Sequence, residues 1–286
     1  MNESITTCII CKGRYKSELF YIHEISCNME SKYRLRNKCK KGSLCSASGK
    51  KYELKIHKII SKSLFNGVPF NTQSIDEIGG STANIDLLCV SNIGIECKKA
   101  STPDWMQCCI KWNSDLAKFA PSSSSKNPSS CTEIFTQILN EINLYNGAIP
   151  PFMERKLKYE EWCDIKKEDD RWNDLYIDIP NNTIKELYWR KGCQYIQVSD
   201  GYGLYHLGND PCDFNVPEFI VDQQLRIRIK VHTKCDKMGF TKLSIMAACQ
   251  PKSNALKSMV KSVYSLDSIE KLPPGLTYDD NLGGLL

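Results

Sequence analysis

The sequence predicts an α/β fold, in which helices and strands follow one another along the chain. Apolar residues recur at helical spacing over residues 52–64 and again over residues 132–145. Two short apolar runs, 84–90 and 93–99, flank a Ser-Asn turn, which is the arrangement of a β-hairpin. Residues 225–232 alternate apolar with basic side chains, the period-two pattern of a half-buried strand.

The composition is that of a globular protein. The chain has 286 residues, of which 41% are hydrophobic and 25% are charged. This length is enough for about one or two domains. No apolar run approaches the roughly 20 residues that a membrane-spanning helix needs, so no membrane association is expected. The start, MNESITTCII, lacks the basic and apolar regions of a secretory signal. An intracellular protein of the cytoplasm or nucleus is therefore expected, not a secreted one.

The 15 cysteines are unusual beside only 4 histidines. An odd number without a secretory signal favours reduced thiols over disulfides. Five of them fall in the first 45 residues: Cys8, Cys11, Cys27, Cys39 and Cys45. The same end is basic, because residues 1–62 hold 14 Lys and Arg against 5 Asp and Glu, a net charge of +9. A basic segment predicts a polyanionic partner, most commonly nucleic acid, although a solvated basic surface is the alternative.

Residues 1–48 are predicted to form a small Cys-rich, basic module. Two pairs of metal-ligating residues have nearly the spacing of a small zinc finger: Cys8-x₂-Cys11 and His23-x₃-Cys27. Bound Zn²⁺ would let this short, weakly apolar segment fold. Cys39 and Cys45 offer a competing second pair, and thiols without metal are also compatible with the pattern.

Residues 49–150 are predicted to form the core of the protein. Its first helix follows Ser48-Gly49 and ends before Gly67, and the hairpin comes next. The run Ser101–Asp104 (STPD) then supplies a capping hydroxyl, a proline in the first turn and an acid. These signals predict a helix that continues to about Phe119. A low-complexity loop separates it from the helix over residues 132–145.

Residues 151–286 are predicted to be rich in strands and to complete the core, to bind nucleic acid, or to do both. Strands are expected within residues 184–207 and over 240–247. On the strand 225–232, three basic residues share one face: Arg226, Arg228 and Lys230. Such a stripe could follow a phosphate backbone, and a solvated sheet face is the alternative.

A carboxylate–lysine constellation lies on the predicted hairpin. Asp86 is on its first strand, and Glu96 and Lys98 share one face of its second strand. Two carboxylates held close together repel each other and favour a hard cation such as Mg²⁺, which prefers oxygen ligands. A nearby lysine can orient an attacking water or stabilise charge on a phosphate. The alternative is a structural ion pair between Glu96 and Lys98.

The segment from Gly79 to Leu88, followed by Ile95-Glu96-Cys97-Lys98, resembles the core of the PD-(D/E)xK nucleases. This is the restriction-endonuclease-like superfamily, and the resemblance covers roughly residues 50–145. Ile85 stands where the family name places a proline. The resemblance implies a mixed central sheet flanked by helices and Mg²⁺-dependent hydrolysis of phosphodiester bonds.

The resemblance also implies a role for individual residues. Asp86 and Glu96 would be metal ligands, together with the backbone carbonyl of Cys97. Lys98 would assist the attacking water. Glu53, on the upstream helix, would be an auxiliary acid, and Gln107, on the downstream helix, would orient the phosphate or the site.

Together these features predict a restriction- or repair-like endonuclease that uses Mg²⁺ or Mn²⁺, with double-stranded DNA as the expected partner. A homodimer would supply two active sites for the two strands. One alternative is a nucleic-acid-binding protein that has a nuclease-like fold and no catalysis. Another is an interaction protein in which the acid–lysine cluster is only an ion-pair network.

Overall fold

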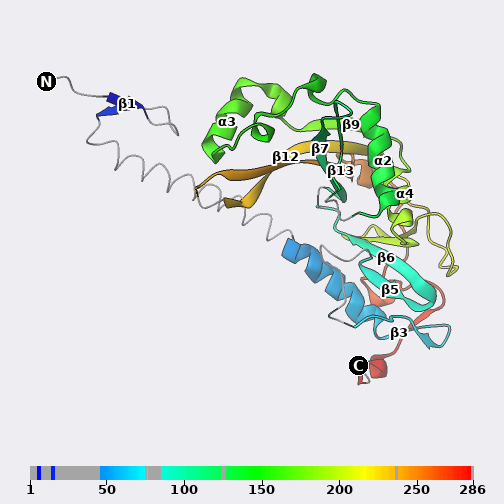
Figure 1. Cartoon of the computed structure of the whole chain (residues 1–286). Helices are drawn as coiled ribbons and strands as arrows, with labels where there is room; N and C mark the ends of the chain where they lie inside the picture. The colour runs from blue at the N-terminus through cyan, green and yellow to red at the C-terminus, as the bar shows by residue number, and fades with distance from the viewer. Residues whose placement is uncertain are drawn as a thin grey trace.

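The structure is a computed structural model of the whole chain (Figure 1). It describes residues 5–7, 14–16, 46–74, 76, 85–102, 104–123, 127–235 and 238–284. The residues predicted to bind zinc, together with the rival pair, lie outside the described residues: Cys8, Cys11, His23, Cys27, Cys39 and Cys45. The zinc module therefore stays a prediction.

A four-stranded mixed sheet carries the predicted hairpin. Its strand order is β11-β10-β6-β5. The strands are β5 (Leu87–Cys89), β6 (Ile93–Lys98), β10 (Tyr195–Val198) and β11 (Gly203–His206). β6 pairs in parallel with β10, whereas β5 and β11 pair antiparallel with their neighbours. Both β5–β6 and β10–β11 are hairpins, and the first of them is the hairpin that the sequence predicts.

A second sheet has five antiparallel strands in the order β8-β7-β13-β12-β9. They are β7 (Met106–Asn113), β8 (Lys118–Pro121), β9 (Leu175–Ile179), β12 (Gln223–Cys235) and β13 (Thr241–Pro251). Figure 1 shows helices on one side of this sheet. They are α2 (Ser129–Asn140), α3 (Tyr159–Glu168) and α4 (Thr183–Arg190). Each of the two sheets combines strands from both sides of residue 150.

The remaining elements are short. The chain is helical over residues 46–60, and a three-stranded sheet follows the order β14-β3-β4. The other short helices and strands are β1 (Ile5–Thr7), β2 (Arg14–Lys16), β3 (Ser63–Phe65), β4 (Val68–Pro69), α5 (Ala255–Ser258) and β14 (Leu276–Tyr278). The 3-10 turns are η2 (Val90–Asn92), η3 (Leu144–Gly147), η4 (Pro151–Met153), η5 (Asp170–Trp172), η6 (Ile269–Lys271) and η7 (Asp280–Gly284). Within the described part of the chain, no helix is both long and apolar enough to cross a bilayer.

Two hydrophobic cores lie on the two faces of the mixed sheet. One core packs Ile56 and Ile60 of the helix 46–60 against Ile95 of β6 and Tyr195 of β10. The other core contains Ile196, the next residue of β10, and joins this sheet to the five-stranded sheet and its helices. Strand β6 is therefore covered on both faces, which explains why all of its residues but Lys98 are buried.

The predicted helix over residues 101–119 is wrong, because this segment forms β7 and β8. Met106, Cys108 and Ile110 are buried in alternation, which is strand periodicity, and β7 completes a ladder with β13. Asp104, expected in the first helical turn, has a backbone φ of +63° and is buried. The tertiary pairing of the strand thus overrides a local helix-start signal, and Gln107 lies on a strand.

Residues 183–190, expected within a strand region, form helix α4. Ile184, Leu187 and Tyr188 are buried at helical spacing and face the larger core. Two other predicted helices are confirmed but end early. The first gives way to β3, and α2 ends before Tyr145, whose φ of +55° does not fit a helix.

Candidate active site

The end of the β5–β6 ladder brings Asp86 beside β6. The last ladder pair joins Leu87 to Ile95. One residue further along, a carboxylate oxygen (Oδ2) of Asp86 accepts a hydrogen bond of 2.9 Å from the backbone amide of Cys97. The amide and carbonyl of a strand residue point to the same side of the strand, so the carbonyl of Cys97 also faces the Asp86 side. The structure thus places Asp86 next to the backbone predicted to share a metal with it.

Glu96 lies between two lysines in the interior. Its carboxylate is almost fully buried and forms an ion pair with Lys98 through Oε1. Its second oxygen, Oε2, lies 3.4 Å from the Nζ of Lys191 and accepts a weak hydrogen bond from the Cys193 thiol at 3.8 Å. Both oxygens of Glu96 are therefore engaged with cations, and Lys191 joins the cluster from the end of α4.

Lys98 and Lys191 also share an aromatic neighbour. Their ammonium groups lie 5.2 and 5.4 Å from the centre of the Tyr188 ring. The Tyr188 hydroxyl donates a 2.6 Å hydrogen bond to the carbonyl of Trp105 and so fixes the ring. Tyr188 and Lys191 were not predicted as site residues. The run Tyr-Trp-Arg-Lys gives no motif, and only the parallel β6–β10 pairing brings it to Glu96.

Glu53 approaches the same cluster from the helix over residues 46–60. One of its carboxylate oxygens is buried and has no hydrogen-bond partner among the described residues. Burial raises the pKa of Glu53, the charges of Lys50 and Lys98 oppose that rise, and the charge of Glu96 adds to it. The predicted auxiliary acid is thus electrostatically coupled to the β6 residues.

The electrostatics of the cluster move the pKa values of Asp86 and Glu96 in opposite directions. Burial and the neighbouring charge of Glu96 raise the pKa of Asp86 to about 7. Burial alone would raise the pKa of Glu96, but Lys98 and Lys191 hold it below its usual value. Burial alone would lower the pKa of Lys98, but Glu96, together with Tyr188 and Asp86, raises it well above its usual value. Near neutral pH, Glu96 is ionised while Asp86 exchanges a proton.

The donor set has the chemistry of a hard-cation site. Glu53, Asp86 and Glu96 offer oxygen ligands, and a divalent cation would offset their mutual repulsion. The unpartnered oxygen of Glu53 is free to accept a metal ion or its water. In the part of the chain that is described, no three His, Cys, Asp or Glu side chains are already grouped closely enough to hold a metal. A bound cation would therefore require these side chains to close in.

Gln107 is not connected to this cluster by any contact among the described residues. It lies on β7 opposite Ala248, and its backbone carbonyl accepts a 2.7 Å hydrogen bond from Asn127. The predicted role of Gln107 depended on a helix that the structure does not contain. No feature of the described site replaces that role.

The basic stripe on β12 is partly neutralised within the protein. Arg226 pairs with Asp174 at 2.5 Å and lies 3.4 Å from Asp104. Arg228 pairs with the second oxygen of Asp104 at 2.6 Å. Lys230 is exposed and has no ion-pair partner among the described residues. Of the three predicted residues, Lys230 alone keeps a free charge on the described surface.

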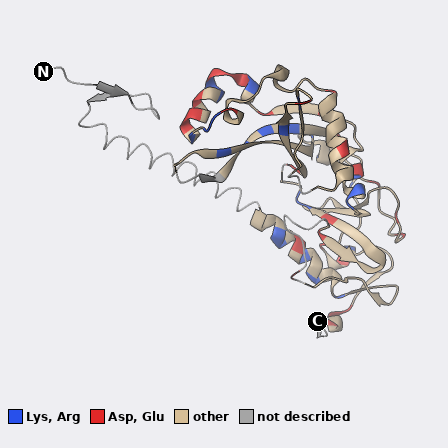
Figure 2. Ribbon diagram, in the orientation of Figure 1, with Lys and Arg blue, Asp and Glu red and all other residues tan. Residues whose placement is uncertain are grey.

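Two further lysines extend the free positive charge on this sheet face. Strand alternation and the ladder register place Lys111 of β7 and Lys242 of β13 on the same face as Lys230. Both are exposed, and neither has an ion-pair partner among the residues described here. Figure 2 shows basic residues along β12, on the sheet that adjoins the acidic cluster. Lys111, Lys230 and Lys242 are called the basic face below.

No protein-family model and no curated protein matches the chain. A solved structure described as HhaI endonuclease in complex with DNA matches with a TM-score of 0.36 and 14% sequence identity. The match covers 67% of this chain and 89% of that chain. This is a distant similarity to a DNA endonuclease, and its TM-score is too low for the comparison to assign a fold or an activity.

Proposed function

We propose that this protein is a metal-dependent endonuclease that hydrolyses phosphodiester bonds, with DNA as its substrate. The observation that carries the proposal is the convergence of Asp86, Glu96 and Lys98 with Glu53 in one buried cluster. Glu53 comes from a helix, Asp86 from the bend just before β5, and Glu96 and Lys98 from β6, where Lys98 is paired directly with Glu96. Buried groups with displaced pKa values that interact at close range are typical of catalytic sites.

In this proposal Asp86, Glu96 and the carbonyl of Cys97 hold Mg²⁺ or Mn²⁺. A bound divalent ion would lower the pKa of a water molecule and neutralise charge on the phosphate. Lys98 orients the attacking water and stabilises charge that develops on the phosphate oxygens. Glu53, with its unpartnered oxygen, would accept a hydrogen bond from a water ligand of the metal. Lys191 remains on Glu96 and keeps it ionised when Lys98 turns towards the substrate.

In this proposal the DNA substrate lies along the basic face. Lys111, Lys230 and Lys242 provide uncompensated charge next to the sheet that carries the site. Phosphate contacts of this kind orient a duplex without reading its sequence. Zn²⁺ at Cys8, Cys11, His23 and Cys27 in the N-terminal module, and a homodimer with two active sites, are further parts of the proposal.

A second candidate function is nucleic-acid binding without catalysis. The observation that favours it is the pairing of both Glu96 oxygens with lysines, which leaves that carboxylate satisfied without a metal. A cluster of this kind could serve only to join β6 to α4. The basic face would bind nucleic acid equally well in either case.

The deciding experiment incubates the full chain with supercoiled plasmid in Mg²⁺ or in a chelator. The nuclease proposal expects nicked, linear or fragmented DNA in Mg²⁺ alone, and loss of cleavage in Glu96→Ala and Lys98→Ala. DNA binding that remains in these variants separates lost catalysis from lost folding. Salt-dependent binding without cleavage at any divalent metal would select the second candidate. Full metal-dependent cleavage by Glu96→Ala would overturn the proposed site.

A further inference from the structure

A pocket of about 650 Å³ lies where the helix over residues 46–60 meets the end of strand β6 and the turn between β10 and β11. Three lysines line it: Lys51 and Lys55 on the helix, and Lys99 directly after β6. Residues four apart share one face of a helix, so Lys51 and Lys55 border the pocket together. The pocket therefore gathers lysines from two separate elements.

The pocket adjoins the candidate active site. Lys99 is the residue after Lys98, and consecutive Cα atoms are about 3.8 Å apart. On the helix, Tyr52 lines the pocket and directly precedes Glu53, the acid that is coupled to β6. The residues of the acidic cluster do not line the pocket themselves. A group bound in the pocket would thus lie next to the acidic cluster without occupying it.

The three lysines carry charge that the described protein does not neutralise. None of them has an ion-pair partner among the described residues. Lys51 and Lys55 are exposed, and Lys99 is half-buried, with its Nζ donating a 2.7 Å hydrogen bond to Oγ of Ser48. A hydroxyl accepts this bond without cancelling the charge, so all three ammonium groups remain available to an anion.

Two aspartates also line the pocket, but they do not cancel its charge. The two oxygens of Asp267 already accept hydrogen bonds from the hydroxyls of Tyr52, at 2.9 Å, and Ser265, at 2.7 Å. Asp200 is exposed in the turn between β10 and β11, and no described lysine pairs with it. Three ammonium groups against two carboxylates leave the lining with a net charge of +1, which favours an anion.

Two hydroxyl groups of the pocket are placed as hydrogen-bond donors. Oγ of Ser48 accepts from Lys99, and Oγ of Ser199 accepts a 3.0 Å bond from the backbone amide of Ala100. A hydroxyl that accepts a hydrogen bond still has its own proton to donate. Neither proton has an acceptor among the described residues, although Ser199 is only 3% exposed. A ligand with several acceptor oxygens would satisfy both hydroxyls.

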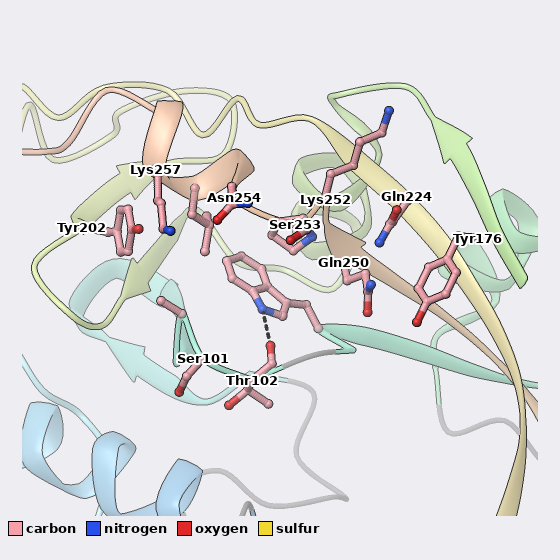
Figure 3. Close-up of a pocket in the computed structure, with 14 residues that line it drawn as sticks. Ser101, Thr102, Tyr176, Tyr202, Gln224, Gln250, Lys252, Ser253, Asn254 and Lys257 are labelled. Atoms are coloured by element: carbon pink, nitrogen blue, oxygen red, sulfur yellow. Dashed lines mark hydrogen bonds between the residues drawn. The ribbon is translucent and has the colours of Figure 1, made fainter. Parts of the chain in front are cut away.

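A second pocket, of about 760 Å³, begins at the next residue of the chain, Ala100, and is less suited to an anion. Figure 3 shows mostly uncharged side chains around it, among them Gln224 and Gln250. Of its two lysines, Lys252 is paired with Asp178 at 2.9 Å. The first pocket therefore offers three cations that are unpaired in the described structure, where the second offers one.

We infer that the pocket lined by Lys51, Lys55 and Lys99 binds one phosphate group of the substrate strand, close to the bond that the acidic cluster cleaves. The phosphate oxygens accept hydrogen bonds from the ammonium groups and from the hydroxyls of Ser48 and Ser199. A phosphate held there anchors the strand beside the cluster. That the phosphate belongs to a nucleic-acid strand rests on the proposed function, whereas the binding of a phosphate does not.

The test replaces Lys51, Lys55 and Lys99 together by Gln and measures DNA binding of the full chain by anisotropy. A chelator prevents cleavage from interfering. We expect the slope of log K against log salt to fall by about 1, because the three lysines share one phosphate, which contributes about 0.9. A fall of about 3 would mean three separate phosphate contacts, and that result would overturn the inference, as would an unchanged slope.

Lys58→Gln is the matched control, because Lys58 is exposed on the same helix and does not line the pocket. This change should leave the slope unchanged. A fall in Lys58→Gln equal to that of the triple variant would show that the charge of the helix acts without the pocket, and would also overturn the inference.

A second arm separates the two sources of a phosphate group. It compares thermal unfolding in inorganic phosphate and in chloride of equal ionic strength, because a ligand of the folded protein raises Tm. The general stabilising effect of phosphate salts is common to wild type and the triple variant. A larger rise in wild type would support the pocket and show that it accepts free phosphate. Equal rises, with the slope reduced by about 1, would support the pocket and identify the polynucleotide backbone as the source.

The outcomes for the pocket and for the nuclease can be told apart. In Mg²⁺ the triple variant should cleave with KM raised about tenfold and kcat nearly unchanged, because the pocket supplies binding that is equal in the ground and transition states. The expected fall in slope, in a protein that cleaves nothing, would leave the pocket standing while the nuclease proposal fails. Metal-dependent plasmid cleavage, with the slope unchanged in the triple variant, would do the reverse.

Discussion

Lys191 gives Glu96 a second cation, at 3.4 Å, in addition to Lys98. In Lys191→Met, the pKa of Glu96 should rise, because one of the two charges that hold it down is gone. We expect cleavage to fall about tenfold or more at pH 6 and to recover partly at pH 9, a change in the pH profile. Rates of plasmid nicking by wild type and Lys191→Met across this pH range test the expected change in the pH profile.

Lys191→Arg should restore most of the activity because it keeps the charge. Lys185→Met is the matched control, since Lys185 also lies on α4 but pairs with Glu218. A uniform loss of activity without any change in the pH profile would show that Lys191 only supports the fold.

The raised pKa of Asp86, about 7, makes stability depend on pH. The folded protein holds this proton more tightly than the unfolded chain, so the free energy of unfolding falls as pH rises from about 4 to 7. Asp86→Asn cannot ionise and should therefore be more stable than wild type at pH 8, by on the order of 1–3 kcal/mol. Urea unfolding in a chelator at pH 5 and pH 8 measures the difference. An equal difference at both pH values would contradict it.

At the scale of elements, the close approach of β6 to the turn after α4 sets the position of Lys191. A Cβ on Gly94 would lie 2.4 Å from the carbonyl oxygen of Gly192, so no side chain fits there. Gly94→Ala should lower the free energy of unfolding by about 1–3 kcal/mol and displace the neighbouring site. Chemical denaturation and the cleavage rate report the two effects.

Gly49 provides the matched comparison for this substitution. It lies in the helix over residues 46–60, and a Cβ there would meet nothing within 4 Å. Gly49→Ala should raise stability by about 0.5–1 kcal/mol. Equal effects of the two substitutions would show that the contact at Gly94 is not tight.

The elements also show what the sequence could and could not predict. The β5–β6 hairpin follows from local patterns and appears in the structure, with Glu96 and Lys98 on its second strand and Asp86 one residue before its first. The helix expected after Asp104 failed because pairing with β13 and ion pairs to β12 decide that segment. Lys191 lies 95 residues from Glu96, and no local pattern reports a contact at that separation.

At the scale of the whole molecule, the basic face should dominate the salt dependence of DNA binding. Replacing Lys111, Lys230 and Lys242 by Gln should reduce the slope of log K against log salt by about 2–3, since each phosphate contact contributes about 0.9. Anisotropy titrations at salt concentrations from about 50 to 200 mM measure this slope.

Replacing Lys158, Lys166 and Lys167 by Gln serves as the comparison. These three lysines belong to α3 and its N-cap, which lie among the helices on the other side of the sheet. These changes should leave the slope unchanged. Equal slopes for both triple variants would show that the duplex does not lie along the basic face.

The contact of the Glu53 helix and the strand after it with residues 267–278 has a consequence for synthesis. The strand just after the Glu53 helix pairs with Leu276–Tyr278, and Tyr52 on that helix donates to Asp267 at 2.9 Å. Glu53 is made early, but the contacts of its helix and of the next strand with these late residues form only after they have left the ribosome. These contacts on the Glu53 helix are therefore completed last. A chain interrupted before residue 260 would carry Glu53, Asp86, Glu96 and Lys98 without the late segment that contacts the Glu53 helix and the strand after it.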